Sequence, residues 1–194
     1  MVRRSFAALA LVAAGLLVTG VARAEKLEQG DKAPAFKATG VDGKEYSLDS
    51  AKGADAVVVC FTCNRCPVSV AYEDRFIEFT KKYSDKGVKF VAINVNRGED
   101  LSAMKQRAEE KGFNFPYAFD ESGDSARAYG ARVTPHLFVL DKNRNIVFQG
   151  PFDDKMSNPS EHYVADAVDA VLSGKQPSVS EKKPFGCGIQ PNKK

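Results

Sequence analysis

The sequence predicts an α/β fold with a mixed central sheet flanked by helices, and two observations carry this prediction. First, two continuous apolar runs, Ala56 to Phe61 and Val88 to Val95, are typical of strands buried on both faces. The amphipathic stretch Pro67 to Tyr83 between them predicts a helix, so the three segments form a right-handed crossover between parallel strands. Second, His136 to Leu140 and Ile146 to Gln149 flank a polar turn and predict an antiparallel hairpin.

The elements before the crossover form a small N-terminal hairpin. Its turn is Val41-Asp42-Gly43-Lys44, and the run Glu45 to Leu48 supplies the returning strand. Because the run Ala56 to Phe61 shows no polar face, we expect it at the centre of the sheet.

The elements after the crossover follow in chain order. Glu99 to Lys111 predicts a second helix, and Phe113 to Ala118 predicts a short strand. Pro116 places this strand at an edge of the sheet, because proline has no backbone N–H to donate. Ser125 to Tyr129 predicts a helical turn, and Val164 to Gly174 predicts the last helix.

Residues 1–24 have the pattern of a secretory signal peptide. Arg3 and Arg4 precede an apolar run from Phe6 to Val21, and Ala22-Arg23-Ala24 predicts cleavage after Ala24. This run is shorter than the ~20 residues of a membrane span, although a retained anchor is the alternative. We therefore expect an exported protein located in the periplasm. Residues 25–174 then form one domain, and residues 175–194, rich in Pro, Ser, Lys and Gly, a flexible C-terminal tail.

The charge of the mature chain argues against some classes of partner. Residues 1–24 hold three of the 28 Lys and Arg residues and no acidic residue, so their removal lowers the formal charge from +3 to 0. Nucleic acids and anionic membranes are bound through clustered Lys and Arg. We expect neither as the main partner.

The motif Cys63-Asn64-Arg65-Cys66-Pro67 lies between the central strand and the long helix. A thiol at a helix start is stabilised as the thiolate, the form that attacks disulfides, and Arg65 would add to this effect. A fixed structural bridge is the alternative. It would contribute little to stability, because stabilisation by a disulfide grows with the length of the loop that it closes.

The order of elements and this motif together resemble the thioredoxin-like fold. Within it, the chain is similar to the redoxin branch, which includes the alkyl hydroperoxide reductase and thiol-specific antioxidant proteins and exported thiol-disulfide oxidoreductases. The residues that carry the resemblance are Gly30, Asp31, Ala33, Pro34, Phe36, Asp42-Gly43-Lys44, the Cys63 to Pro67 motif, Tyr129-Gly130, Val133-Thr134-Pro135 and Phe138 to Asp141.

This resemblance implies the roles of four residues. Pro135 would be cis and pack against the cysteine pair, and the backbone of Thr134 would be the edge on which a substrate chain docks. Cys63 would attack and form a mixed disulfide with a partner, and Cys66 would resolve it. The partners would be protein thiols or disulfides and an upstream electron donor or acceptor, with no cofactor. The direction of electron flow stays open.

Three departures from the familiar pattern leave a peroxidase as an alternative. Thr62 stands where thioredoxins usually have Trp, the chain has no Trp at any position, and Pro67 follows the second cysteine instead of lying between the two. A cysteine followed by proline is similar to the peroxidatic site of peroxiredoxins. In that family, however, a threonine occupies the position of Cys63, and a proline occupies that of Val59.

A third interpretation is a metal carrier. Cys63, Cys66 and His136 would suit copper or zinc, although related copper-delivery proteins space their cysteines by three residues instead of two. Cys60 is expected to be a small core residue; the alternative is the start of an iron-sulfur run with Cys63 and Cys66. Cys187 is either a resolving thiol on the tail or an ordinary surface cysteine.

Overall fold

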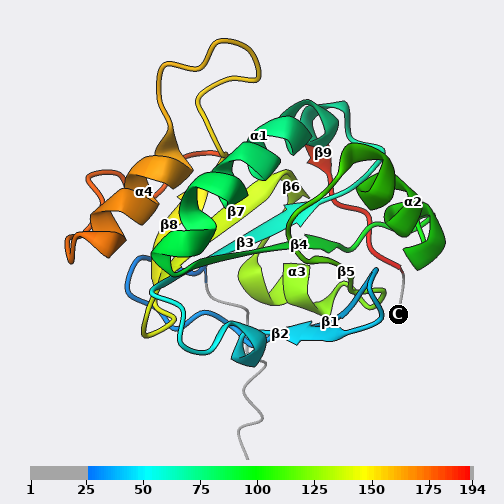
Figure 1. Cartoon of the computed structure of the whole chain (residues 1–194), viewed down its shortest axis with the longest axis horizontal. Coiled ribbons are helices and arrows are strands. Elements are labelled where there is room, and N and C mark those ends of the chain that lie inside the picture. The colour runs from blue at the N-terminus through cyan, green and yellow to red at the C-terminus, as the bar shows by residue number, and fades with distance from the viewer. Residues whose placement is uncertain (1–25, 193–194) are drawn as a thin grey trace, which may run out of the picture.

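The structure of the protein, a computed structural model, describes residues 26–192, so the predicted signal peptide 1–24 and its cleavage site lie outside the described residues. A seven-stranded sheet with the order β2-β1-β5-β4-β3-β7-β8 forms its centre (Figure 1). The strands are β1 (Lys37–Gly40), β2 (Glu45–Ser47), β3 (Ala56–Thr62), β4 (Val88–Asn94), β5 (Tyr117–Phe119), β7 (His136–Asp141) and β8 (Ile146–Gly150). A second, two-stranded sheet pairs β6 (Val133–Thr134) with β9 (Cys187–Gly188).

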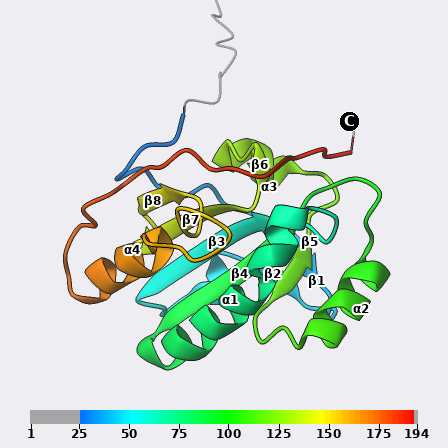
Figure 2. The ribbon, with the colours of Figure 1, turned by 90° about the horizontal axis from the view of Figure 1, so that it is seen from above.

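Helices cover both faces of the large sheet. They are α1 (Pro67–Tyr83), α2 (Leu101–Lys111), α3 (Asp124–Tyr129) and α4 (Tyr163–Leu172), with short 3-10 turns at Asp49–Ala51 and Ser84–Lys86. Helices α1 and α4 lie on one face and α3 lies on the other (Figure 2). Within residues 26–192, no helix has the length and apolar character that a membrane crossing requires.

The predicted crossover and both predicted hairpins are confirmed. Strand β3 pairs in parallel with β4 and antiparallel with β7, and all seven of its residues are buried. Strands β7 and β8 form the second hairpin and β1 and β2 the first. The edge position predicted for the strand near Pro116 is wrong, because β5 lies between β1 and β4. Pro116 precedes the strand and uses only its carbonyl oxygen, which accepts the N–H of Ala92 at 2.9 Å.

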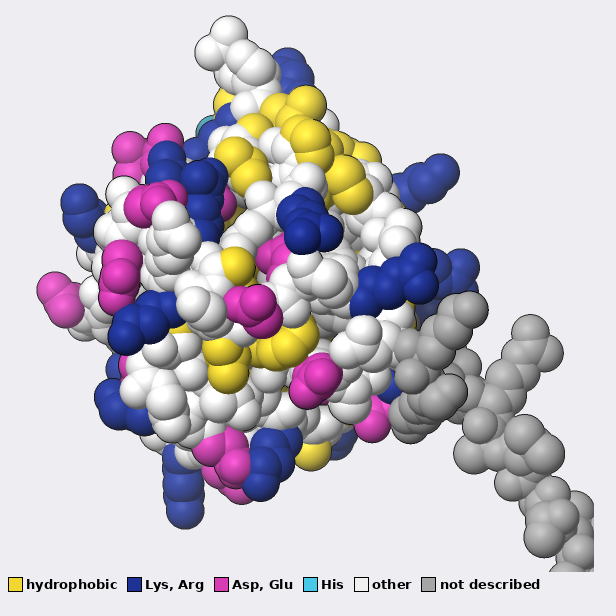
Figure 3. Space-filling model, turned by 90° about the vertical axis from the view of Figure 1, so that its right-hand side faces the viewer, with side chains coloured by type: hydrophobic (Ala, Val, Ile, Leu, Met, Phe, Trp, Pro, Cys, Tyr) yellow, Lys and Arg dark blue, Asp and Glu magenta, His cyan; other side chains and the backbone are white. Residues whose placement is uncertain are grey.

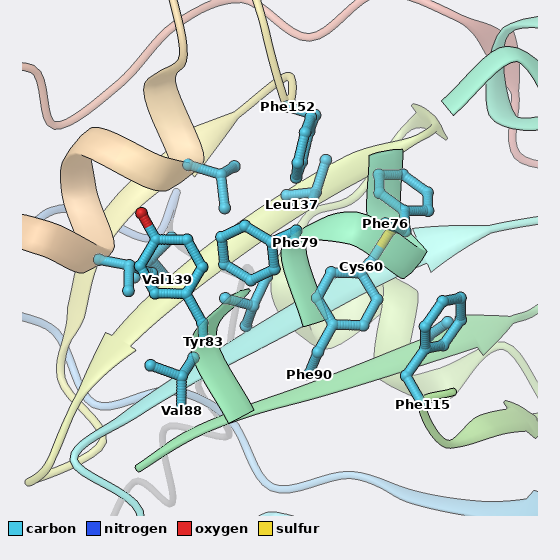
Figure 4. Packing of buried hydrophobic residues seen from close by; sticks show 14 of the residues in the cluster. Cys60, Phe76, Phe79, Tyr83, Val88, Phe90, Phe115, Leu137, Val139 and Phe152 are labelled. Carbon is cyan, nitrogen blue, oxygen red and sulfur yellow. The ribbon is translucent and has the colours of Figure 1, made fainter. Parts of the chain in front are cut away.

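The core on the α1 face is rich in aromatic rings (Figure 4). Phe76 and Phe79 of α1 contact Phe152 with ring centroids 5.2 and 5.7 Å apart, both edge to face. Cys60 lies in the same cluster and is fully buried, as a core residue would be. This packing fixes the first turn of α1 above the end of β3, where the chain passes through the cysteine motif.

The C-terminal segment differs from the expected flexible tail. It runs from the end of α4 across the molecule and reaches β6 and α3 (Figure 2). Its backbone makes hydrogen bonds along the way: Lys182 N–H donates to Gln149 O at 3.0 Å, and Arg97 N–H donates to Gln190 O at 2.8 Å. The polar composition of this segment gives no sign of these bonds, because they use main-chain groups.

One side of the molecule carries both signs of charge. In the space-filling view, acidic and basic side chains are interspersed on this side, and no large area of one sign stands out (Figure 3). This distribution agrees with the formal net charge of 0 of residues 25–194.

Candidate functional site

The cysteine motif occupies the turn that joins β3 to α1. Thr62 ends the strand, Pro67 begins the helix, and Cys66 is the N-cap residue. The Sγ atom of Cys66 accepts the N–H of Ser69 at 3.5 Å, as an N-cap side chain does. Cys63 lies three residues earlier, in the turn. Both are free thiols, with exposed fractions of only 4% for Cys63 and 1% for Cys66.

The two sulfurs meet the loop that precedes β7. The Thr134-Pro135 peptide bond is cis, which confirms the prediction for Pro135. Cys66 Sγ donates to the carbonyl oxygen of Thr134 at 3.0 Å, and Cys63 Sγ lies 3.3 Å from the Thr134 hydroxyl. Thr134 itself is fully buried. The two cysteines and Thr134, which is distant from them in the sequence, are therefore brought together at the start of α1.

Cys66, and not Cys63, is the residue at the start of the helix, and both side chains are buried, Cys63 slightly less than Cys66. A hydrogen bond from Cys63 lowers the pKa of Cys66, and the N–H of Ser69 adds to this effect against the cost of burial. The same bond to Cys66, together with burial and the charge of Glu99, raises the pKa of Cys63.

The contacts of the Cys66 sulfur favour opposite protonation states. In the dithiol form its thiol donates to the carbonyl of Thr134, which favours the protonated sulfur. Once that proton leaves, the S–H of Cys63 and the N–H of Ser69 both point at a thiolate. The two donors lower the pKa of Cys66, against the carbonyl of Thr134 and against burial.

A partly buried polar cluster that sequence reasoning missed holds the turn. Glu99 accepts the backbone N–H of Asn64 at 3.0 Å and that of Arg65 at 3.3 Å. Asn94 donates to the same carboxylate at 2.7 Å, and the hydroxyl of Tyr117 donates to the Asn64 side chain at 2.8 Å. Glu99 lies 33 residues beyond Cys66 in the sequence, and only the pairing of β3, β4 and β5 brings the cluster together.

Arg65 and His136 have other surroundings than expected. Arg65 is exposed, and its guanidinium lies beside Gly98. His136 has an exposed fraction of 6%, and its Nδ1 atom makes no hydrogen bond within the described residues. It lines an open pocket of about 1180 Å³ together with Tyr129, Gln149 and Glu181. Burial lowers the pKa of His136 to about 4.

The described part of the chain holds no group of three or more His, Cys, Asp or Glu side chains that could bind a metal ion. The set Cys63, Cys66 and His136 that a metal carrier would use is therefore not assembled. Cys60 is also separate from the motif, because it points into the core among Phe76 and Phe90 (Figure 4).

The family model for Redoxin matches residues 28–167. The chain belongs to the Redoxin family. This Redoxin is 30% identical over 125 residues to the thiol-disulfide oxidoreductase ResA of Bacillus thuringiensis subsp. konkukian, a match covering 63% of the chain and 69% of ResA. The match to ResA of Bacillus anthracis is also 30% identical, over 127 residues, 64% of the chain and 70% of that protein.

Solved structures agree with this assignment. A hypothetical protein of Sinorhizobium meliloti 1021 is 32% identical with a TM-score of 0.81, covering 88% of this Redoxin and 98% of that chain. A thiol:disulfide interchange protein of the thioredoxin family from Chlorobium tepidum TLS is 25% identical with a TM-score of 0.58, covering 80% and 99%. The Redoxin thus has the thioredoxin-like fold and is an enzyme of the thiol-disulfide oxidoreductase class.

Proposed function

We propose that Cys63 and Cys66 are the redox pair of this enzyme and that they exchange between dithiol and disulfide with partner proteins. The observation that carries this proposal is the convergence of both sulfurs on Thr134, next to the cis Pro135. A structural bridge would not need a capped thiolate, whereas an exchanging pair does, since the thiolate is the nucleophile.

In the reducing direction, the Cys66 thiolate attacks one sulfur of a disulfide, so the two cysteines exchange the roles that the family resemblance implies for Cys63 and Cys66. A Cys66 mixed disulfide forms and the other sulfur leaves as a thiolate. Cys63 then loses its proton to that leaving group and attacks Cys66, which closes the Cys63–Cys66 bond and releases the second sulfur. Two electrons pass from the pair to the partner. The oxidising direction is the same sequence in reverse.

The surroundings of the pair support this order of events. The Cys66 sulfur is held by Ser69 N–H at the start of α1, and the turn that carries Cys63 is held by Glu99. With both ends fixed, the second sulfur stays close to the first, so that resolution is intramolecular and fast. Residues 1–24 support export of this activity, because they combine basic residues, an apolar run and an Ala-x-Ala site.

Reduction of insulin disulfides by the purified protein, with dithiothreitol as electron donor, tests the proposal. We expect Cys63→Ser and Cys66→Ser each to lower the rate at least about 100-fold, because exchange needs both sulfurs. Cys60→Ala is the matched control, since this cysteine is buried in the core and should keep the rate. Full activity in either serine variant would contradict the proposal.

A peroxide reductase is the second candidate, and the capped Cys66 thiolate favours it. Peroxide turnover that is lost in Cys66→Ser but kept in Cys63→Ser would establish that activity. Loss in both variants would assign the activity to the pair.

A further inference from the structure

The C-terminal segment occupies the backbone edge of Thr134. Strand β9 runs antiparallel to β6, with Thr134 opposite Cys187 and Val133 opposite Gly188. The pairing continues beyond the strands, where Ile189 N–H donates to Arg132 O at 2.9 Å and Gln190 N–H donates to Asn96 Oδ1 at 2.7 Å. An extended chain that adds a strand to a free edge in this way is a standard mode of peptide recognition. The chain's own tail is bound as a substrate chain would be.

This register places a third sulfur at the site. Cys187 is the strand partner of Thr134, whose carbonyl oxygen lies 3.0 Å from Cys66 Sγ. Cys66 raises the pKa of the Cys187 thiol and the backbone N–H of Val68, in the first turn of α1, lowers it, so both groups lie close to the Cys187 sulfur. Cys187 is therefore a neighbour of the sulfur that caps the helix.

The three thiols differ in their access to a partner. Cys63 and Cys66 are buried, with exposed fractions of 4% and 1%, whereas Cys187 is half-buried. While β9 is in place, a disulfide of another protein reaches Cys187 before it reaches either sulfur of the pair. Displacing β9 would break its two-residue pairing with β6, whereas exchange through Cys187 leaves it bound.

We propose that Cys187 is a third redox-active thiol, which relays disulfide exchange between partner proteins and the Cys63–Cys66 pair. This relay rests on the proposed function of the pair. Cys187 attacks a partner disulfide, forms a mixed disulfide and releases one partner sulfur, which takes the proton of the Cys187 thiol. The Cys66 thiolate then attacks Cys187, which releases the second partner sulfur and leaves a Cys66–Cys187 bond. Cys63, on losing its proton, attacks Cys66 and frees Cys187 with that proton.

Two glycines of the tail provide a matched pair of variants. A Cβ atom on Gly186 would lie 2.0 Å from the carbonyl oxygen of Thr134, so an alanine there forces β9 away from β6 without altering any sulfur. A Cβ atom on Gly188 would meet no atom within 4 Å. Gly186→Ala therefore tests the docking of the tail, and Gly188→Ala is its control.

Tryptic mapping can distinguish the three disulfides. Cleavage after Arg65 places Cys63 and Cys66 on separate peptides, and Cys187 lies on a third peptide that begins after Lys182. The full chain with Cys63→Ser is oxidised with diamide, blocked with iodoacetamide and digested. We expect a stoichiometric Cys66–Cys187 peptide. In this background Gly186→Ala should lower its equilibrium yield against glutathione at least about tenfold, and Gly188→Ala should not change it.

The possible failures can be told apart. If oxidised wild-type protein forms no Cys63–Cys66 peptide, the proposed function is overturned. If that peptide forms, but oxidised Cys63→Ser shows both Cys66 and Cys187 alkylated by iodoacetamide, only the relay is overturned. The relay would also be overturned if Gly186→Ala and Gly188→Ala gave equal yields of the Cys66–Cys187 peptide, with circular dichroism showing that both variants are folded.

Discussion

Cys66 and Thr134 are joined by a hydrogen bond of 3.0 Å between the thiol and the carbonyl oxygen, although 68 residues separate them in the sequence. The same threonine touches Cys63 through its hydroxyl and pairs with Cys187 through its backbone. One residue thus contacts the cap of α1, the turn before it and the tail. The arrangement of the site depends on the loop between α3 and β7 as much as on the cysteine motif.

The hydroxyl of Thr134 should control the reactivity of Cys63. It lies 3.3 Å from the Cys63 sulfur, and this hydrogen bond acts to lower the pKa of Cys63. Thr134→Val keeps the shape and removes the bond, so it should slow alkylation of Cys63 by roughly three- to tenfold at neutral pH, the effect of losing about 1 kcal/mol of thiolate stabilisation. Rates of iodoacetamide labelling measure this, with Thr80→Val as the control. An unchanged Cys63 rate would contradict the role given to Thr134.

Glu99 should act on the same sulfur in the opposite direction. Its negative charge raises the pKa of Cys63, while its oxygens hold the backbone of Asn64 and Arg65. Glu99→Gln keeps an acceptor and removes the charge, so the pKa of Cys63 should fall. Thiolate absorbance near 240 nm during a pH titration measures it.

Glu109→Gln is the matched control for Glu99→Gln. Glu109 is an exposed carboxylate that pairs with Lys105 on α2, so its loss should leave the titration unchanged. If the thiolate titration of Glu99→Gln coincides with that of wild type, or moves to higher pH, the charge of Glu99 does not raise the pKa of Cys63.

His136 should make the protein less stable in acid. Its pKa is lowered by burial from 6.5 to about 4, so the unfolded chain binds this proton more readily than the folded one. The folded state therefore loses stability as the pH falls from about 6.5 to about 4, by roughly 3 kcal/mol in total. Urea unfolding at a series of pH values should show this loss reduced in His136→Phe. If the unfolding free energies of wild type and His136→Phe fall equally with pH, the titration of His136 is not the cause of the acid instability.

The ion pair between Arg107 and Glu73 should stabilise the contact of α2 with α1. Glu73 is buried, and both of its oxygens accept from the guanidinium, at 2.9 and 2.6 Å. Arg107→Met leaves an unpaired buried carboxylate and should cost about 3 kcal/mol of unfolding free energy. The double variant with Glu73→Gln should recover most of this loss in urea unfolding. If Arg107→Met and the double variant lose the same unfolding free energy, the unpaired charge of Glu73 is not the cause of the loss.

Sequence reasoning found the elements more easily than the site. Strand β3 and helix α1 are readable because burial on both faces and a period of 3.6 leave clear patterns. The position of β5 was not readable, because Pro116 suggested an edge and only the pairing with β1 and β4 shows otherwise. Local motifs predict local structure, whereas strand order depends on the whole chain.

The cysteine motif and the cis Pro135 were predicted from the residues and the family resemblance. Glu99 was not, since a single glutamate before a helix has no distinguishing pattern. For Cys187 the sequence left a resolving thiol and a surface cysteine both open, because strand β9 is two residues long and is held by main-chain bonds, which composition does not reveal.

Equilibration of the purified protein with glutathione buffers, followed by acid quenching and tryptic mapping, tests the central claim most directly. We predict that the Cys63–Cys66 disulfide forms and opens reversibly as the ratio of reduced to oxidised glutathione is varied, while Cys60 stays reduced throughout. A Cys63–Cys66 bond that is absent at every ratio, or that persists in excess dithiothreitol, would contradict the assignment of this pair as the redox centre.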